Sequence, residues 1–167
     1  MQNNTARQLI EDIERSGSNV MTTAAGAGTP PAPPRLNFNR FAEYYGAPSD
    51  QKWQIEILKR LFELTQMSPD WDSYGAPVPT RDASFFVLEI LNNVMRSRTP
   101  IPQVVPSSVG GIQLEWHEKD IDLELHVTAP YQCEVWFHDR RSGAPTSTEL
   151  TNDFSSLSAP ISELTLR

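Results

Sequence analysis

Carboxylates and imidazoles recur at every second position in one segment of the chain. They are Glu115, His117, Asp122, Glu124, His126, Glu134 and His138, with Trp136 among them. Side chains of these types can attract a cationic surface, bind a divalent metal ion or exchange protons. All three histidines of the chain are in this set. What they do depends on the element that brings them together.

The same segment predicts three consecutive β-strands between Val109 and Asp139, because apolar and polar residues alternate with a period of two. The apolar side is formed by Ile112, Leu114, Trp116, Ile121, Leu123, Leu125, Val127, Tyr131, Cys133, Val135 and Phe137. The polar side also carries Gln113 and Gln132. We therefore expect one face to be buried in a core and the opposite, acidic face to be open.

Hairpin turns are expected at residues 117–120 and 128–130, which implies a register with Asp122 opposite both Glu115 and Trp136. In the same register Glu124 lies between Gln113 and Glu134. Like charges on opposite residues destabilise a sheet, and the strands themselves contain no lysine or arginine. An uncompensated acidic face around an exposed tryptophan favours a binding surface for a cationic partner. The alternative is a solvated face on which the acids only provide solubility.

A metal site is a second interpretation, since His117 and His138 are expected near Asp120 and Asp139 at one end of the sheet. Imidazole with carboxylate suits zinc or manganese. Exposed strand positions lack the surrounding hydrogen bonds that orient metal ligands, so we predict neither metal nor cofactor.

Catalytic motifs are missing from the sequence, which has no Walker loop, dinucleotide fingerprint, HExxH pair or GxSxG elbow. We predict that the protein is not an enzyme and name no catalytic residue. The remaining enzymatic alternative is a metal-dependent hydrolase or nuclease that uses Glu115, Asp122 and Glu124, although no basic residue is expected nearby to hold a phosphate.

Two amphipathic helices precede the strands, at residues 51–67 and 81–98, with Thr80 as the N-cap of the second. An edge strand is expected at residues 103–106, because its prolines lack the backbone donors that a central strand needs. The expected fold is α+β, with two helices packed on one face of a three- to four-stranded antiparallel meander. The expected domain covers residues 38–141.

The flanking segments differ in composition. Residues 1–37 predict a flexible extension, with either a short amphipathic docking helix around Leu9, Ile10 and Ile13 or a frayed tail. Residues 142–167 are rich in serine and threonine and predict a loosely docked tail.

The composition narrows the class of protein. The chain has 167 residues, a net charge of -7 and one cysteine, Cys133. No internal disulfide can form, and no segment has the roughly 20 apolar residues of a membrane span. We expect a soluble, cytoplasmic protein whose partner is a protein with a basic surface, not a nucleic acid or a membrane. The oligomeric state is open.

A loop of sequence Trp71-Asp72-Ser73-Tyr74-Gly75-Ala76 joins the two helices. Trp71 and Tyr74 are expected to cover the base of the helix pair, with Asp72 bonded to the loop backbone. In the alternative, Trp71, Asp72 and Tyr74 form a recognition loop, because exposed aromatic residues often anchor partners.

This loop and the later sequence Gly110-Gly111-Ile112-Gln113-Leu114-Glu115-Trp116-His117 carry a resemblance. Between Leu61 and Val127 the chain resembles a group of small, largely uncharacterised bacterial proteins associated with mobile elements, bacterial defence and toxin-antitoxin loci. The resemblance implies a module of two helices and a sheet with an inhibitor or antitoxin-like role, and no catalytic residue. The alternative is a structural subunit of a larger multiprotein assembly.

Overall fold

The computed structural model describes residues 38–44, 52–150 and 153–167, which belong to one compact unit. Its elements are α2 (Phe38–Tyr44), α3 (Lys52–Thr65), α4 (Arg81–Val94), β1 (Gln103–Pro106), β2 (Ile112–Glu118), β3 (Ile121–Ala129), β4 (Gln132–Asp139), β5 (Thr146–Leu150) and α5 (Ser155–Leu166). The short helix expected near Leu9 lies outside the described residues. Among the described helices, none has the length and apolar character required to cross a bilayer.

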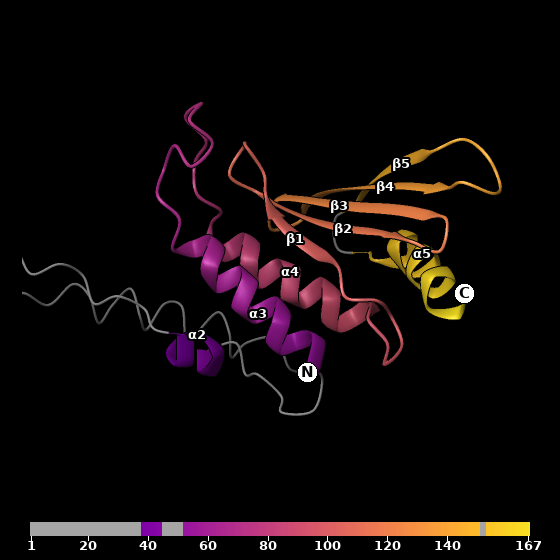
Figure 1. Cartoon of the computed structure of the whole chain (residues 1–167), viewed down its shortest axis with the longest axis horizontal. Coiled ribbons are helices and arrows are strands. Elements are labelled where there is room, and N and C mark those ends of the chain that lie inside the picture. The colour runs from indigo at the N-terminus through magenta and orange to yellow at the C-terminus, as the bar shows by residue number, and fades with distance from the viewer. Residues whose placement is uncertain (1–37, 45–51, 151–152) are drawn as a thin grey trace, which may run out of the picture. The chain divides into compact units, whose positions relative to one another are not determined.

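The five strands form one antiparallel sheet in chain order, β1-β2-β3-β4-β5. The predicted α+β class and the meander are confirmed, but the sheet has one strand more than the largest number expected. Figure 1 shows α3, α4 and α5 on the same side of this sheet. No described helix covers the other side.

The two long helices form where the apolar stripes predict them. Thr80 caps α4, and its side-chain oxygen accepts a hydrogen bond from Ala83 N at 3.1 Å. The helix ends at Val94 instead of residue 98, because Met95 is extended with ψ at 143°. Thr99 Oγ1 then accepts a hydrogen bond from Arg96 N at 3.0 Å, which fixes the turn beyond the helix.

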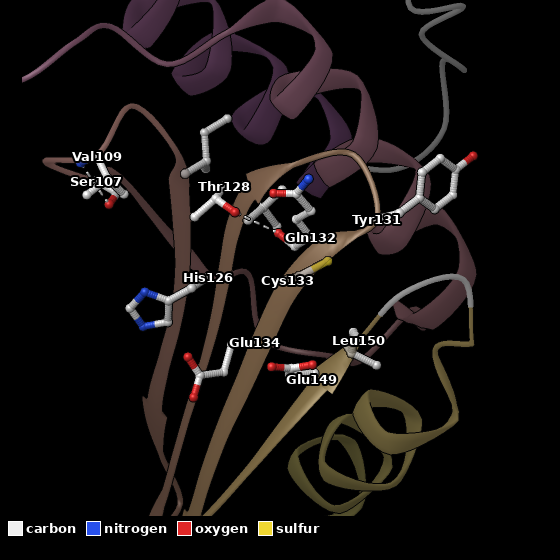
Figure 2. Close-up of a pocket in the computed structure, with 12 residues that line it drawn as sticks. Ser107, Val109, His126, Thr128, Tyr131, Gln132, Cys133, Glu134, Glu149 and Leu150 are labelled. Carbon is white, nitrogen blue, oxygen red and sulfur yellow. Dashed lines mark hydrogen bonds between the residues drawn. The ribbon is translucent and has the colours of Figure 1, made fainter.

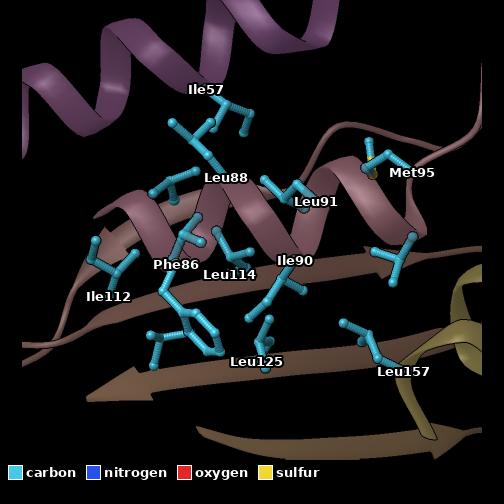
Figure 3. Packing of buried hydrophobic residues seen from close by; sticks show 14 of the residues in the cluster. Ile57, Phe86, Leu88, Ile90, Leu91, Met95, Ile112, Leu114, Leu125 and Leu157 are labelled. Carbon is cyan, nitrogen blue, oxygen red and sulfur yellow. The ribbon is translucent and has the colours of Figure 1, made fainter. Parts of the chain in front are cut away.

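The core lies between α4 and the apolar side of the sheet, as Figure 3 shows. Ile90 from α4 packs with Leu114 and Leu125 from the strands, and all three are fully buried. Leu157 joins them from α5. Burying side chains of this size contributes about 1.5–3 kcal/mol each, so this layer fixes which face of the sheet stays open.

The C-terminal segment is integral to the fold, in contrast to the loosely docked tail expected at residues 142–167. β5 pairs with β4 in a regular antiparallel register. Leu150, Leu157, Ile161 and Leu164 are at most 2% exposed. The apolar residues of this segment are few, but nearly all of them reach the core, so the domain does not end at residue 141.

The hairpin turns are shorter than expected, and this corrects the register. Trp116 lies opposite Leu123, which leaves only Lys119 and Asp120 in the first turn, with φ of 55° and 63°. The second turn is equally short, because Ala129 pairs with Gln132. Each pairing is shifted by two residues from the expected one. Because strand side chains have a period of two, this shift preserves the two faces.

Candidate functional site

The corrected register places the polar side chains in rows across the open face. The central row contains Gln103, Glu115, Glu124, Trp136 and Ser147, each opposite the next on neighbouring strands. Glu124 thus lies between Glu115 and Trp136, and not between Gln113 and Glu134 as expected. We call Glu115, Asp122, Glu124, Glu134 and Glu149, together with Trp136, the acidic face.

Glu115 and Glu124 share a hydrogen-bond donor from a neighbouring side chain. Gln113 Nε2 donates to Glu115 Oε1 at 2.8 Å and to Glu124 Oε2 at 3.1 Å. His126 Nε2 lies 3.2 Å from the same oxygen of Glu124. One amide donor shared by two carboxylates offsets their repulsion less than a cation would. Glu115 and Glu124 therefore remain neighbouring negative charges.

The charge of Asp122, in contrast, is neutralised by Arg140, which was not expected near this face. Arg140 follows β4 and bonds to both carboxylate oxygens, with Nε 2.7 Å from Oδ2 and Nη2 on Oδ1. His117 Nδ1 lies 2.9 Å from Oδ1, and His138 Nδ1 lies 3.9 Å from Oδ2. The Arg140 bond is the main reason that the pKa of Asp122 falls from 3.8 to about 2. The expectation that no basic residue lies near this face is therefore wrong at Asp122.

Trp136 is half-buried, whereas the alternation of the sequence predicted an exposed side chain. Its ring meets the ring of His138 edge-on, with centroids 6.0 Å apart. It lies opposite Glu124 on one side and Ser147 on the other. The flanking side chains orient the indole and leave part of it open beside the carboxylates.

Glu149 extends the acidic face onto β5 and was missed, because no strand was expected in that segment. It lies directly opposite Glu134, whose Oε1 accepts a hydrogen bond from the Ser147 hydroxyl. Figure 2 shows Glu134, Glu149 and His126 on adjacent strands. All three line a hollow of about 420 Å³. Within the described residues, the ion pairs of Glu115, Glu124, Glu134 and Glu149 include no lysine or arginine.

The hollow in Figure 2 also has an apolar part. Tyr131 is 55% exposed, with φ of 64° in the second hairpin turn, although it was expected on the apolar face. Cys133 lines the hollow from β4, and burial raises the pKa of its thiol to about 11. A thiol with this pKa is protonated at neutral pH and is therefore a poor nucleophile.

The Trp71 loop is held by its own hydrogen bonds. Asp72 Oδ1 accepts from Tyr74 N at 2.8 Å and from Ala76 N at 3.0 Å, and these bonds lower the pKa of Asp72. Trp71 Nε1 donates to Pro77 O at 3.2 Å. The Tyr74 side chain is 93% exposed and does not cover the helix pair. The loop therefore has a bonded frame that presents one free aromatic ring.

The loop also packs on the turn between β1 and β2. A Cβ atom on Gly110, which has φ of 85°, would lie 2.9 Å from Pro77 Cγ. The hydrogen bonds of Trp71, Asp72 and Tyr74 join residues of the loop to each other, and none of them reaches the acidic face. The predicted site residues thus fall into two separate groups, one on the sheet and one in the loop.

The side chains considered as metal ligands are arranged differently from the expectation. Among the described residues, no group of three or more His, Cys, Asp or Glu side chains is arranged to hold a metal ion. His117 and His138 both approach Asp122, and not Asp120 or Asp139 as expected, and Arg140 takes both Asp122 oxygens.

The arrangement can bind cations through carboxylates that, among the described residues, pair with no lysine or arginine, and it can bury an aromatic contact. These are the properties of a recognition surface. The chain matches no protein-family model, and neither the curated proteins nor the solved structures contain a significant match to it.

Proposed function

We propose that the protein is a non-enzymatic binding module that attaches to a basic protein through the acidic face. The observation that carries this proposal is the direct opposition of Glu115 and Glu124 on a sheet face that no described helix covers. Within the described part of the chain, each of them has a histidine nearby and neither pairs with a lysine or arginine. Opposed like charges reduce the stability of the free protein. A partner that supplies cations at this point relieves that repulsion.

The contacts also suggest which residues contribute binding energy. Glu115, Glu124, Glu134 and Glu149 provide charge, and the half-buried Trp136 provides an aromatic contact in their midst. Charge accelerates encounter, whereas a desolvated aromatic contact slows dissociation. Asp122 has a different role, because Arg140 already neutralises the charge of its carboxylate. It marks the end of the acidic face.

An inhibitor or antitoxin-like factor is the specific function that we infer. The resemblance to small proteins of defence and toxin-antitoxin loci that we expect from the sequence between Leu61 and Val127 motivates this proposal, and the chemistry of the face supports it. Proteins that act on nucleic acids carry basic surfaces, and an acidic sheet face can cover such a surface. The same acidic character disfavours direct binding to nucleic acid.

The test is an affinity purification of the tagged protein from its native cells, followed by mass spectrometry. The test variant is the double substitution Glu124→Lys and Glu134→Lys. Its matched control is Glu56→Lys with Glu89→Lys, which makes the same charge change at exposed helix positions. We expect one basic partner to be kept by the wild type and the control and lost by the test variant.

Salt dependence provides the second readout. Raising the ionic strength from about 0.1 M to 1 M shortens the screening length from about 10 Å to 3 Å, so the complex should weaken steeply. If both variants retain the same partners, the acidic face is only a solvated surface and the proposal fails. Circular dichroism of both variants confirms that each is folded.

A further inference from the structure

The two edges of the sheet differ in how their backbone groups are covered. At the β1 edge, Arg60 Nε from α3 donates to Val104 O at 2.9 Å. Pro102 and Pro106 flank this contact and have no backbone donor. Natural sheets protect their edges with such devices, because free strand edges pair with other chains.

At the β5 edge, no described side chain donates a hydrogen bond to the strand backbone, and the strand contains no proline. Among the described strands, β5 pairs only with β4, so alternate N–H and C=O groups of Thr146–Leu150 point away from the sheet. Residues 146–149 are exposed, and the strand contains neither proline nor lysine. Its outer backbone groups are therefore available to a sixth strand.

The two sides of this edge have different chemistry. Ser147 and Glu149 lie on the open side, beside Trp136 and Glu134. Thr148 points to the helix side, where a hollow of about 490 Å³ separates the outer strands from α5. Its lining includes Phe137 and Thr148 from the strands, Pro160 from α5, and the acidic residues Asp139 and Glu163.

We propose that the β5 edge binds an extended segment of the basic partner as an added strand. Every second side chain of such a segment would be a lysine or arginine beside Glu149 and Glu134. The intervening side chains would be apolar and would contact Phe137 and Pro160, which belong to the apolar part of a lining that also contains acidic and hydroxyl side chains. Main-chain hydrogen bonds provide affinity in this mode of recognition, and the alternating side chains provide specificity. This inference rests on the proposed function, since it specifies how the same partner engages the acidic face.

A second copy of the chain fits this edge less well. Antiparallel pairing of two β5 strands about Thr148 would leave threonine side chains facing each hollow, which are too small to fill it. It would also bring together two chains that each carry a net charge of -7. Charge complementarity therefore favours a cationic segment of another protein.

The experiment uses a labelled heptapeptide of alternating lysine and valine and the full-length protein. Fluorescence anisotropy measures binding, and hydrogen exchange followed by NMR locates it. We expect saturable binding with at least about tenfold slower exchange of the outward β5 amides. Two further peptides complete the set, one with the same residues in separate lysine and valine blocks and one N-methylated on the backbone. Both should bind at least about tenfold more weakly.

Protein variants test the edge itself. Thr148→Lys directs a charge into the hollow at the edge and should weaken peptide binding by at least about tenfold. Ser97→Lys adds the same charge at an exposed residue after α4, outside the sheet, and should change the affinity little.

Several outcomes overturn the inference. Equal binding of the N-methylated peptide would mean that charge alone holds it, which leaves the proposed function intact and removes the added strand. Absence of binding by any peptide also refutes the edge site, and the partner captured through the acidic face remains an independent result. A dimer of the free protein that Thr148→Lys dissociates would assign the edge to a second copy.

Discussion

Glu115 and Glu124 lie directly opposite each other on β2 and β3, and the side chain of Gln113 donates to both carboxylates. Directly opposed like charges destabilise an antiparallel pair. We therefore expect Glu115→Gln to raise the free energy of unfolding by about 0.2–1 kcal/mol, while it weakens partner binding. Urea unfolding measures the first effect, and Glu89→Gln on α4 is the control for removing an unopposed carboxylate. A stability loss in Glu115→Gln would contradict the repulsion argument.

The bond between Asp122 and Arg140 predicts a dependence of stability on pH. The folded protein holds the pKa of Asp122 at about 2, below its ordinary value of 3.8. The carboxylate therefore contributes stability that is present above pH 3.8 and is lost as the pH falls through about 2. Arg140→Gln should reduce this acid-dependent loss and lower the stability at neutral pH. The check is urea unfolding of both proteins across this range, and identical pH profiles would show that Arg140 does not stabilise the charge.

Helix α5 should contribute substantially to stability. Leu164 is fully buried and Leu166, in the same turn, is 79% exposed. Leu164→Ala should cost about 2–5 kcal/mol, whereas Leu166→Ala should stay within about 0.5 kcal/mol. Thermal and urea unfolding measure both. Similar small effects of the two substitutions would restore the view of this segment as a loosely docked tail.

Substitutions in the Trp71 loop can distinguish a structural role of the loop from a role in recognition. Asp72→Ala removes the acceptor of two backbone hydrogen bonds, so exchange of the Tyr74 and Ala76 amides should accelerate by at least about tenfold. Tyr74→Ala removes a ring that is 93% exposed and should leave both the exchange and the stability unchanged. A loss of partner binding in Tyr74→Ala alone would identify the loop as a second contact with the partner.

Trp71→Ala complements these variants, because the indole bonds to Pro77 O from a half-buried position. Reduced folding cooperativity would show that the ring supports the loop. Intact folding with weaker partner binding would show that it contributes to recognition.

Periodicity in the sequence predicted the two faces of the sheet, and the structure confirms them because a period of two is insensitive to turn length. It did not predict the register. The two-residue turns place Lys119, Asp120 and Tyr131 at positive φ, where glycine or asparagine would have been the usual signal. Each turn was therefore expected to be longer than it is.

The remaining differences have a common cause, which is that tertiary contacts override local composition. β5 has one apolar residue, Leu150, and so lacks the alternation typical of a strand, while α5 contains Pro160. Neither segment therefore had the usual signal of its element. Arg140 follows β4 directly, but its reach to Asp122 depends on the corrected pairing of Asp122 with His138. The sequence therefore predicted the acidic face but missed both Glu149 and the arginine that limits it.

The contacts at the first hairpin turn have a consequence for the order of folding. Lys119 Nζ donates to Leu164 O at 2.6 Å, and Arg167 Nη2 reaches Asp139 Oδ2 at 2.5 Å. The first bond spans 45 residues of chain. Contacts between such distant residues form late, because the loop between them must close first. The β2–β3 ladder and the contacts of Asp120 with Arg140 and Arg141 involve residues nearer in the chain. A nascent chain that stops before residue 164 can therefore form the hairpin but lacks the bonds that join its turn to α5.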